Sequence, residues 1–391
     1  MSTPPPSALA GVRVLDLASV GPAARASAIL ADYGADIVKV APVPRDAQRQ
    51  IVPAYYAYSG QRGTRRVQID LKADAGREAF LGLVASADVV IESFRPGVLD
   101  RLGLGFAVLA ATRPELIVCS TSGYGQTGPR AATAGHDIDY QAVAGALWNA
   151  ERAPDDKPGL PGATFADSAG GGMHAVIAIL AALLRRQTTG HGEHLDVSIT
   201  DGVLNLTSLI VDEHLATGSE PGPGHDILSG RYACYGAYQC ADGAWVAVGA
   251  IEPAFFANLC RGLGCDEWID AQLDDAAQPR IRAALTTAFA ARARSEWLEA
   301  LGPADTCIAP VNDIASVVSD PQLVARGVFV EAEHPVHGRF RQLGPLLAGM
   351  DPAPEVTPVP DVTITDTDAV FAEAGLTPAA ITELRTAGVV A

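Results

Sequence analysis

The feature that most constrains the fold is an alternation of strand-like and helix-like segments in the first third of the chain. Residues 12–17 are apolar and β-prone, 23–33 favour a helix that Gly34 can end, and 36–40 are apolar again. This order is typical of a β-α-β unit. The same order returns with strands expected at 67–71, 88–91 and 116–120 and a helix at 73–85. The alternation predicts an α/β fold with a mostly parallel, doubly wound, Rossmann-like sheet.

The later segments extend this large domain and then change in character. Helices are expected at 138–148, 168–187 and 200–216, with a short strand at 195–197. Four glycines and two prolines between residues 218 and 230 are typical of a loop. The predicted organisation is a large domain at 1–216, a linker at 217–230, a smaller α+β domain at 231–332, and a C-terminal segment at 333–391 that returns to the large domain. Within the smaller domain, strands are expected at 235–239 and 245–248 and helices at 253–263, 279–291 and 295–301.

Composition and charge narrow the classes of function. The net charge of -17 argues against nucleic acid or an anionic membrane as a partner. The N-terminal run MSTPPPS lacks the features of a secretory signal, and the apolar run at 175–184 is too short to cross a bilayer, so a cytoplasmic protein is expected. The six cysteines have no metal-ligand spacing, and no metal site is predicted. The first strand-helix turn lacks Gly-x-Gly-x-x-Gly, which disfavours a nicotinamide cofactor.

Three side chains form a candidate acid/base apparatus. His136 lies in GHDIDY at 135–140, Asp167 precedes SAGGG at 168–172, and Glu252 follows an apolar strand and precedes Pro253. An imidazole and a carboxylate on opposite faces of a substrate carbon can remove one proton and return another, which is racemase chemistry. The three glycines after Asp167 permit close approach of a ligand to backbone N–H groups.

Each of the three residues also has a purely structural interpretation. Asp167 stands where a helix N-cap belongs, and His136 can be an ordinary loop histidine next to a helix start. Glu252 suits the first turn of a helix, where its charge favours the positive end of the helix dipole. Sequence position alone leaves these alternatives open.

Several longer motifs resemble a known family. The runs LAGVRVLDL at 9–17, GADIVKV at 34–40, SFRPG at 93–97 and GYGQTGP at 123–129 are similar to those of the family III CoA-transferase (CaiB/BaiF) superfamily. The similarity extends over nearly the whole chain. Within that superfamily, GHDIDY at 135–140 and VGAIEP at 248–253 resemble the α-methylacyl-CoA racemase branch.

The resemblance implies roles for the candidate residues. His136, assisted by Glu252, and Asp167 would exchange the proton at C2 of an acyl-CoA thioester through an enolate. CoA is then part of the substrate, and no separate cofactor is implied. The implied assembly is an interlocked homodimer, in which Glu252 can act within its own chain or across the dimer. The implied CoA contacts are Val20, Lys39, Ile69, Leu71, Lys72, Arg95, Arg101, Asp137 and Tyr140.

Two other functions stay open. In the transferases of this superfamily the aspartate that matches Asp167 is a nucleophile, which forms an anhydride and then an aspartyl-CoA thioester. A non-catalytic CoA-binding protein is the third possibility, because a fold alone does not establish activity. The chain also departs from the family pattern at Ala41, where an acidic residue is common, and at 228–235, where LSGRYACY replaces a run typical of racemases. The second departure leaves the acyl group open.

Overall fold

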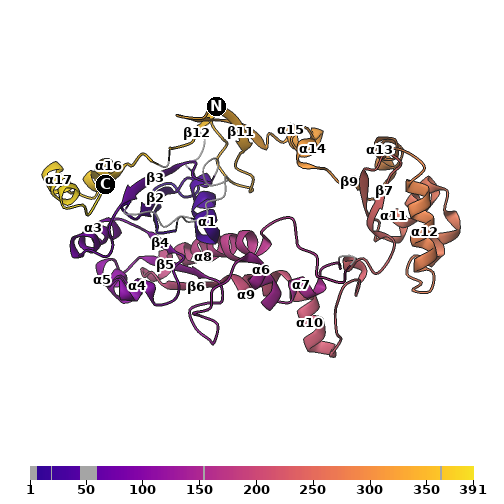
Figure 1. The fold of residues 1–391 in the computed structure, drawn as a ribbon, viewed down its shortest axis with the longest axis horizontal. Coiled ribbons are helices and arrows are strands. Elements are labelled where there is room, and N and C mark those ends of the chain that lie inside the picture. Colours follow the sequence, from indigo (N-terminus) through magenta and orange to yellow (C-terminus); the bar gives the residue numbers. More distant parts are fainter. Residues whose placement is uncertain (1–6, 19, 45–59, 153–154, 362) are drawn as a thin grey trace. The chain divides into compact units, whose positions relative to one another are not determined.

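The structure is a computed structural model that describes residues 7–18, 20–44, 60–152, 155–361 and 363–391. Residues 1–6, where no secretory signal is expected, lie outside this part. The chain divides into two compact units. The first unit contains Met1–Ala144, Pro161–Ser208 and Arg326–Ala391, and the second contains Gly145–Leu160 and Leu209–Ala325. Figure 1 shows the elements of both units in sequence colours, and each unit is described below by itself.

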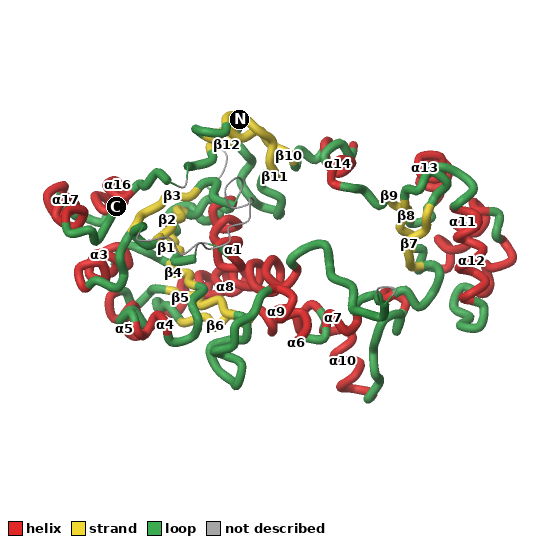
Figure 2. Tube along the Cα trace, viewed as in Figure 1, coloured by secondary structure: helices red, strands yellow, loops and turns green. Residues whose placement is uncertain are grey.

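A six-stranded parallel sheet forms the centre of the first unit (Figure 2). Its strand order is β3-β2-β1-β4-β5-β6. Strands β2 and β3 are added on one side of β1, and β4 to β6 on the other side, so the strand order reverses between β1 and β4. This confirms the predicted parallel α/β sheet. Ligands of such sheets bind outside the carboxyl ends of the strands, at the point of reversal. The strands are β1 Arg13–Asp16, β2 Asp36–Ala41, β3 Thr64–Gln68, β4 Val89–Glu92, β5 Ile117–Ser122 and β6 His194–Ser198.

Alternate side chains of the strands enter two separate apolar clusters, one on each face of the sheet. One face is covered by α1 Gly21–Asp32 and α8 His174–Thr189. The other is covered by α3 Asp74–Val84 and α5 Phe106–Thr112, which α16 Thr367–Glu373 and α17 Pro378–Thr386 join from the C-terminus. Burial on both faces explains why the strands are nearly continuous apolar runs.

Several predicted boundaries are wrong for local reasons. The third strand is Thr64–Gln68 rather than 67–71, because it pairs with β2 along its whole length. The helix expected at 138–148 is two helices, α6 Asp137–Val143 and α7 Ala146–Asn149, separated by Gly145 with φ of 80°. The helix expected at 200–216 also divides at Thr207, into α9 Ile199–Leu206 and α10 Ser208–Thr217.

The helix that contains Asp167 is longer than predicted. A π-helical segment, η1 Ala166–Met173, runs directly into α8, and the combined segment Ala166–Thr189 is long and apolar enough to span a bilayer by length and composition. Core helices of globular proteins meet the same criterion. Ala175, Ile179 and Leu183 pack against the sheet in this structure, which fits a core helix.

Two small sheets complete the structure. In the second unit, β7 Tyr235–Gln239 and β8 Trp245–Gly249 form an antiparallel pair, as predicted, and β9 Ile308–Pro310 adds to β8. In the first unit, β10 Phe329–His334 pairs with β11 Gly338–Leu343 and β12 Val356–Pro358. Further α-helices in the described part of the chain are α4 Val98–Arg101, α11 Pro253–Leu263, α12 Gln278–Phe289, α13 Arg294–Leu301, α14 Ile314–Val317 and α15 Pro321–Ala325.

The units do not follow the predicted domain boundaries at every residue. Residues 145–160 and 209–216 group with the second unit, and 326–332 group with the first. The compact units are defined by contacts between residues, whereas the predicted domain boundaries are placed from the composition of a linker. The predicted domains therefore stay predictions.

Candidate active site

A cavity of about 700 Å³ lies at the carboxyl edge of the parallel sheet. All of its lining residues belong to the first unit. They come from the ends of β1, β2, β4 and β5, from β3, from the start of α1, from 131–140 and from η1 and α9. Six of the residues predicted for the site line it: Val20, Lys39, Arg95, His136, Tyr140 and Asp167.

Buried carboxylates at two strand ends shape the loops around this cavity. Asp16, the last residue of β1, accepts a hydrogen bond of 2.7 Å from the backbone N–H of Ala18. Glu92, the last residue of β4, accepts one of 2.6 Å from the N–H of Phe94. Burial raises the pKa of Glu92. Each carboxylate thus holds the turn that follows its own strand, and the turn after Glu92 carries Arg95.

His136 is the N-cap residue of α6, where the backbone is extended with φ of -129°. Its N–H donates to the carboxylate of Asp139 at 2.9 Å, which fixes the start of the helix. The Tyr140 hydroxyl donates to the Gly135 carbonyl at 2.5 Å. The imidazole is exposed to the cavity and makes no hydrogen bond within the described part of the chain. His136 therefore has a fixed backbone and a ring available to a ligand.

Asp167 is not an N-cap, so that structural alternative is wrong. Phe165 occupies the cap position, and Asp167 is the second residue of η1, with no capping hydrogen bond from its side chain. Its backbone N–H donates to the Asp137 carboxylate at 2.8 Å. The Asp167 carboxyl lines the cavity and accepts no hydrogen bond from the described residues.

The surroundings of Asp167 favour its protonated form. Burial raises the pKa of Asp167, and the nearby charge of Asp137 raises it further. The nearby charges of Arg25 and, to a smaller extent, His136 lower this pKa and so oppose both effects. A carboxyl whose pKa is moved toward neutrality is suited to hold and release a proton.

The glycines after Asp167 serve packing rather than the ligand contact inferred from the sequence. Gly170, Gly171 and Gly172 are buried and are not among the lining residues of the cavity. A Cβ at Gly171 would come within 2.6 Å of the Pro22 side chain on α1. A Cβ at Gly202 on α9 would come within 1.9 Å of the Gly170 carbonyl oxygen. The small residues let η1 approach α1 and α9 closely.

The other predicted CoA contacts lie outside the cavity lining. Ile69 is 1% exposed and, with Leu71 packed beside it, belongs to the core. Lys72 and Arg101 are exposed. Asp137 contacts the backbone of Asp167 as described above. Their contacts with CoA stay predictions.

Lys39 lines the cavity but is already paired. It is 4% exposed, and its ammonium group forms an ion pair with Asp16 and donates to the Ser27 hydroxyl at 2.7 Å. Arg66 also lines the cavity. Its position beside Lys39 depends on the pairing of β2 with β3, which no local sequence signal gives.

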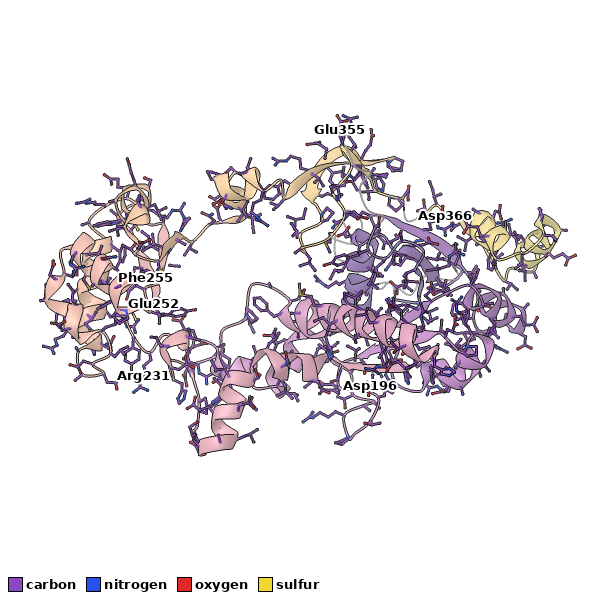
Figure 3. The ribbon with its side chains drawn as sticks, turned by 180° about the vertical axis from the view of Figure 1, so that it is seen from behind. Asp196, Arg231, Glu252, Phe255, Glu355 and Asp366 are labelled. Atoms are coloured by element: carbon purple, nitrogen blue, oxygen red, sulfur yellow. The ribbon has the colours of Figure 1, made fainter. Side chains whose placement is uncertain are left out.

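Glu252 belongs to the second unit. It is the N-cap of α11 rather than a residue of the first helical turn, and Figure 3 labels its side chain. This side chain is exposed and makes no capping hydrogen bond. Burial raises the pKa of the Cys307 thiol, and the nearby charge of Glu252 raises it further. The partnership of Glu252 with His136 stays a prediction.

The fold and the cavity define a parallel α/β protein with an imidazole, a carboxyl and basic groups together at the switch point of its sheet. The family model for CoA-transferase family III matches residues 9–361. The chain belongs to this family.

Relatives and solved structures agree with this assignment. The chain is 33% identical to alpha-methylacyl-CoA racemase of Mus musculus, over 90% of this chain and 88% of the relative. It is 32% identical to acetyl-CoA:oxalate CoA-transferase of Acetobacter aceti, over 82% of this chain and 85% of the relative. A CAIB/BAIF family protein from Brucella suis has the same fold, with a TM-score of 0.75 and 29% identity over 94% and 99% of the two chains. The protein is thus a family III enzyme, either a racemase or a CoA-transferase.

Proposed function

We propose that the protein is a racemase or epimerase that exchanges the C2 proton of a 2-methylacyl-CoA thioester. The observation that carries the proposal is that His136 and Asp167 line one cavity. Similarity to racemases at 33% identity supports the same reaction.

The two groups divide the proton transfers between them. One removes the C2 proton, and the charge passes to the thioester oxygen to give an enolate. The other then delivers a proton to the opposite face of C2. Because its pKa is raised, Asp167 carries a proton more readily than an ordinary aspartate, whereas the unbonded His136 ring accepts one. In the reverse direction the roles exchange. No metal or redox cofactor takes part in the proposed steps.

Glu252 is assigned the supporting carboxylate for His136, either in the same chain or in a partner chain of a homodimer. A carboxylate that accepts from one imidazole nitrogen raises the basicity of the other. Replacement by Gln keeps the size of the side chain and removes the charge. Glu252→Gln should therefore slow exchange, whereas a supporting role is excluded if the rate and its pH profile stay unchanged.

CoA transfer is the second candidate function. The Asp167 carboxyl accepts no hydrogen bond from the described residues, so its oxygens are available for attack on a thioester. Similarity to acetyl-CoA:oxalate CoA-transferase supports this alternative. The two reactions differ in whether a covalent Asp167 intermediate forms and whether an acceptor acid is required.

Incubation with a single-enantiomer 2-methylacyl-CoA in deuterated water, without an acceptor acid, separates the two functions. The racemase should place deuterium at C2 and lose optical purity. His136→Ala and Asp167→Ala should each abolish the loss of optical purity, while CoA binding, measured by calorimetry, changes little. No exchange by protein that binds CoA would contradict the racemase. Transfer of CoA to an acceptor acid, through an aspartyl-CoA thioester at Asp167 that the acceptor acid discharges, would establish the transferase.

A further inference from the structure

Three polar side chains form a row across neighbouring strands beneath the cavity. In the parallel pairing, Asp16 of β1 stands opposite Lys39 of β2, and Lys39 stands opposite Arg66 of β3. Residues paired in this way project from the same face of a sheet. All three line the cavity. The row brings together one carboxylate and two cations, so one positive charge lacks a partner within it.

The ion pairs identify Arg66 as the cation with the excess charge. The Lys39 ammonium is paired with the Asp16 carboxylate and also donates to Ser27. The Arg66 guanidinium donates to the neutral side-chain oxygen of Gln61 at 3.1 Å and has no ion pair with any described residue. Burial lowers the pKa of Arg66 more than its attraction to Asp16 raises it. A half-buried guanidinium in this state is stabilised by a bound anion.

The backbone of Arg66 is fixed on both sides. Its N–H donates to the Asp366 carboxylate at 2.8 Å, and its carbonyl accepts from the Asp366 N–H at 2.6 Å. Figure 3 shows Asp366. Because these bonds use the backbone, they hold the strand in place without neutralising the guanidinium. The side chain is thereby positioned before any ligand binds.

Arg65, the neighbour of Arg66 on β3, has the opposite environment. It projects from the other face of the strand and forms ion pairs with Asp36 at 2.7 Å and with Glu373 at 2.7 Å. Arg62 is likewise paired with Asp32. The three arginines are close in sequence, but Arg66 is the one that lines the cavity. This contrast provides an internal control.

We propose that Arg66 binds a phosphate group of the coenzyme A portion of the substrate, while Lys39, neutralised by Asp16, holds the edge of the sheet. The inference rests on the proposed acyl-CoA substrate. A guanidinium offers several N–H groups in a planar arrangement that matches phosphate oxygens. The negative charge of the phosphate then balances the excess positive charge of the row formed by Asp16, Lys39 and Arg66. Arg95, an exposed residue that also lines the cavity, adds a second and more solvated cation.

Calorimetric titration with three ligands tests this assignment. The ligands are CoA, dephospho-CoA, which lacks the 3′-phosphate, and pantetheine, which lacks all phosphates. Arg66→Gln should weaken CoA binding by about 10-fold or more, since a charge-assisted hydrogen bond is lost. Arg65→Gln should weaken it by less than about 2-fold, because Arg65 faces the other side of the sheet. Arg66→Lys, which retains the charge, should recover part of the loss.

The pattern across ligands identifies the phosphate. If Arg66 contacts the 3′-phosphate, Arg66→Gln should affect CoA and leave dephospho-CoA unchanged. If it contacts the diphosphate, both should weaken equally, with pantetheine unaffected. Unchanged CoA binding, or an equal loss for all three ligands, would overturn the proposal. Because titration requires no turnover, this result is independent of deuterium exchange. If Arg66→Gln weakens CoA binding but the wild-type protein shows no exchange, the racemase proposal fails and the Arg66 proposal stands. If the protein shows exchange but Arg66→Gln binds CoA normally, the Arg66 proposal fails and the racemase proposal stands.

Discussion

At the residue scale, the environment that suits Asp167 to an acid/base role also lowers the stability of the folded protein. Its carboxyl is half-buried beside Asp137, and both features disfavour ionisation. A folded-state pKa above that of the unfolded chain means that ionisation weakens the fold. This cost is absent below the usual aspartate pKa. It grows as the pH rises and is complete above the folded-state pKa.

Asp167→Asn should therefore stabilise the protein at pH 7 while abolishing activity. The expected gain in the free energy of unfolding is about 0.5 to 1 kcal/mol, within the usual range for relief of a strained functional site. Urea unfolding at pH 7 and near pH 4 measures it, and the gain should shrink at the lower pH. A loss of stability at pH 7 would show that the carboxylate forms a stabilising interaction in solution.

Asp137 affects Asp167 in two ways. Its charge raises the pKa of Asp167, and its carboxylate oxygen accepts a hydrogen bond from the Asp167 N–H. Asp137→Asn retains a carbonyl oxygen to accept that bond and removes the charge. The pKa of Asp167 should fall, so the acidic limb of the pH profile of deuterium exchange should move to lower pH. An unchanged limb would mean that another group controls it.

At the element scale, the close approach of η1 to α9 depends on residues without side chains. A Cβ at Gly202 would lie 1.9 Å from the backbone oxygen of Gly170, a contact that only movement of a helix can relieve. The two elements carry Asp167 and the wall of the cavity that contains Ile199. Packing at this crossing therefore affects both stability and the geometry of the site.

Gly202→Ala should lower the free energy of unfolding by about 3 kcal/mol, at the upper end of the usual cost of overpacking. Gly82→Ala is the matched control, because Gly82 also lies within a helix, α3, and a Cβ there meets no atom within 4 Å. The control should instead gain about 1 kcal/mol from the helix propensity of alanine. Equal effects in the two variants, measured by urea unfolding, would show that the helices adjust to the added methyl group.

At the scale of the whole molecule, the predicted homodimer requires a surface for the second copy. Met173, Ile177 and Leu184 are 40%, 66% and 65% exposed and lie along one face of η1 and α8. Their spacing of four and seven residues places them on one helical stripe. An exposed apolar stripe on a core helix is typical of an interface.

We expect the wild-type protein to be a dimer and Ile177→Arg to be shifted toward monomer. Analytical ultracentrifugation at several protein concentrations measures both. A buried arginine without a partner is costly, so the dissociation constant should rise about 100-fold or more. Val108→Arg is the control, because Val108 is 41% exposed on α5, on the other face of the sheet. If wild-type protein is a monomer at all concentrations, the dimer prediction is wrong.

The sequence by itself determined the parallel α/β fold, since alternating strands and helices have few ways to bury apolar surface. It also indicated His136 and Asp167, because their motifs are local. Tertiary structure decided the rest. Register across β1, β2 and β3 paired Lys39 with Asp16 and left Arg66 as the cation without a carboxylate partner in the described chain. Helix packing explained the glycines after Asp167. Pairing and packing join residues far apart in sequence, and such contacts have no local signature.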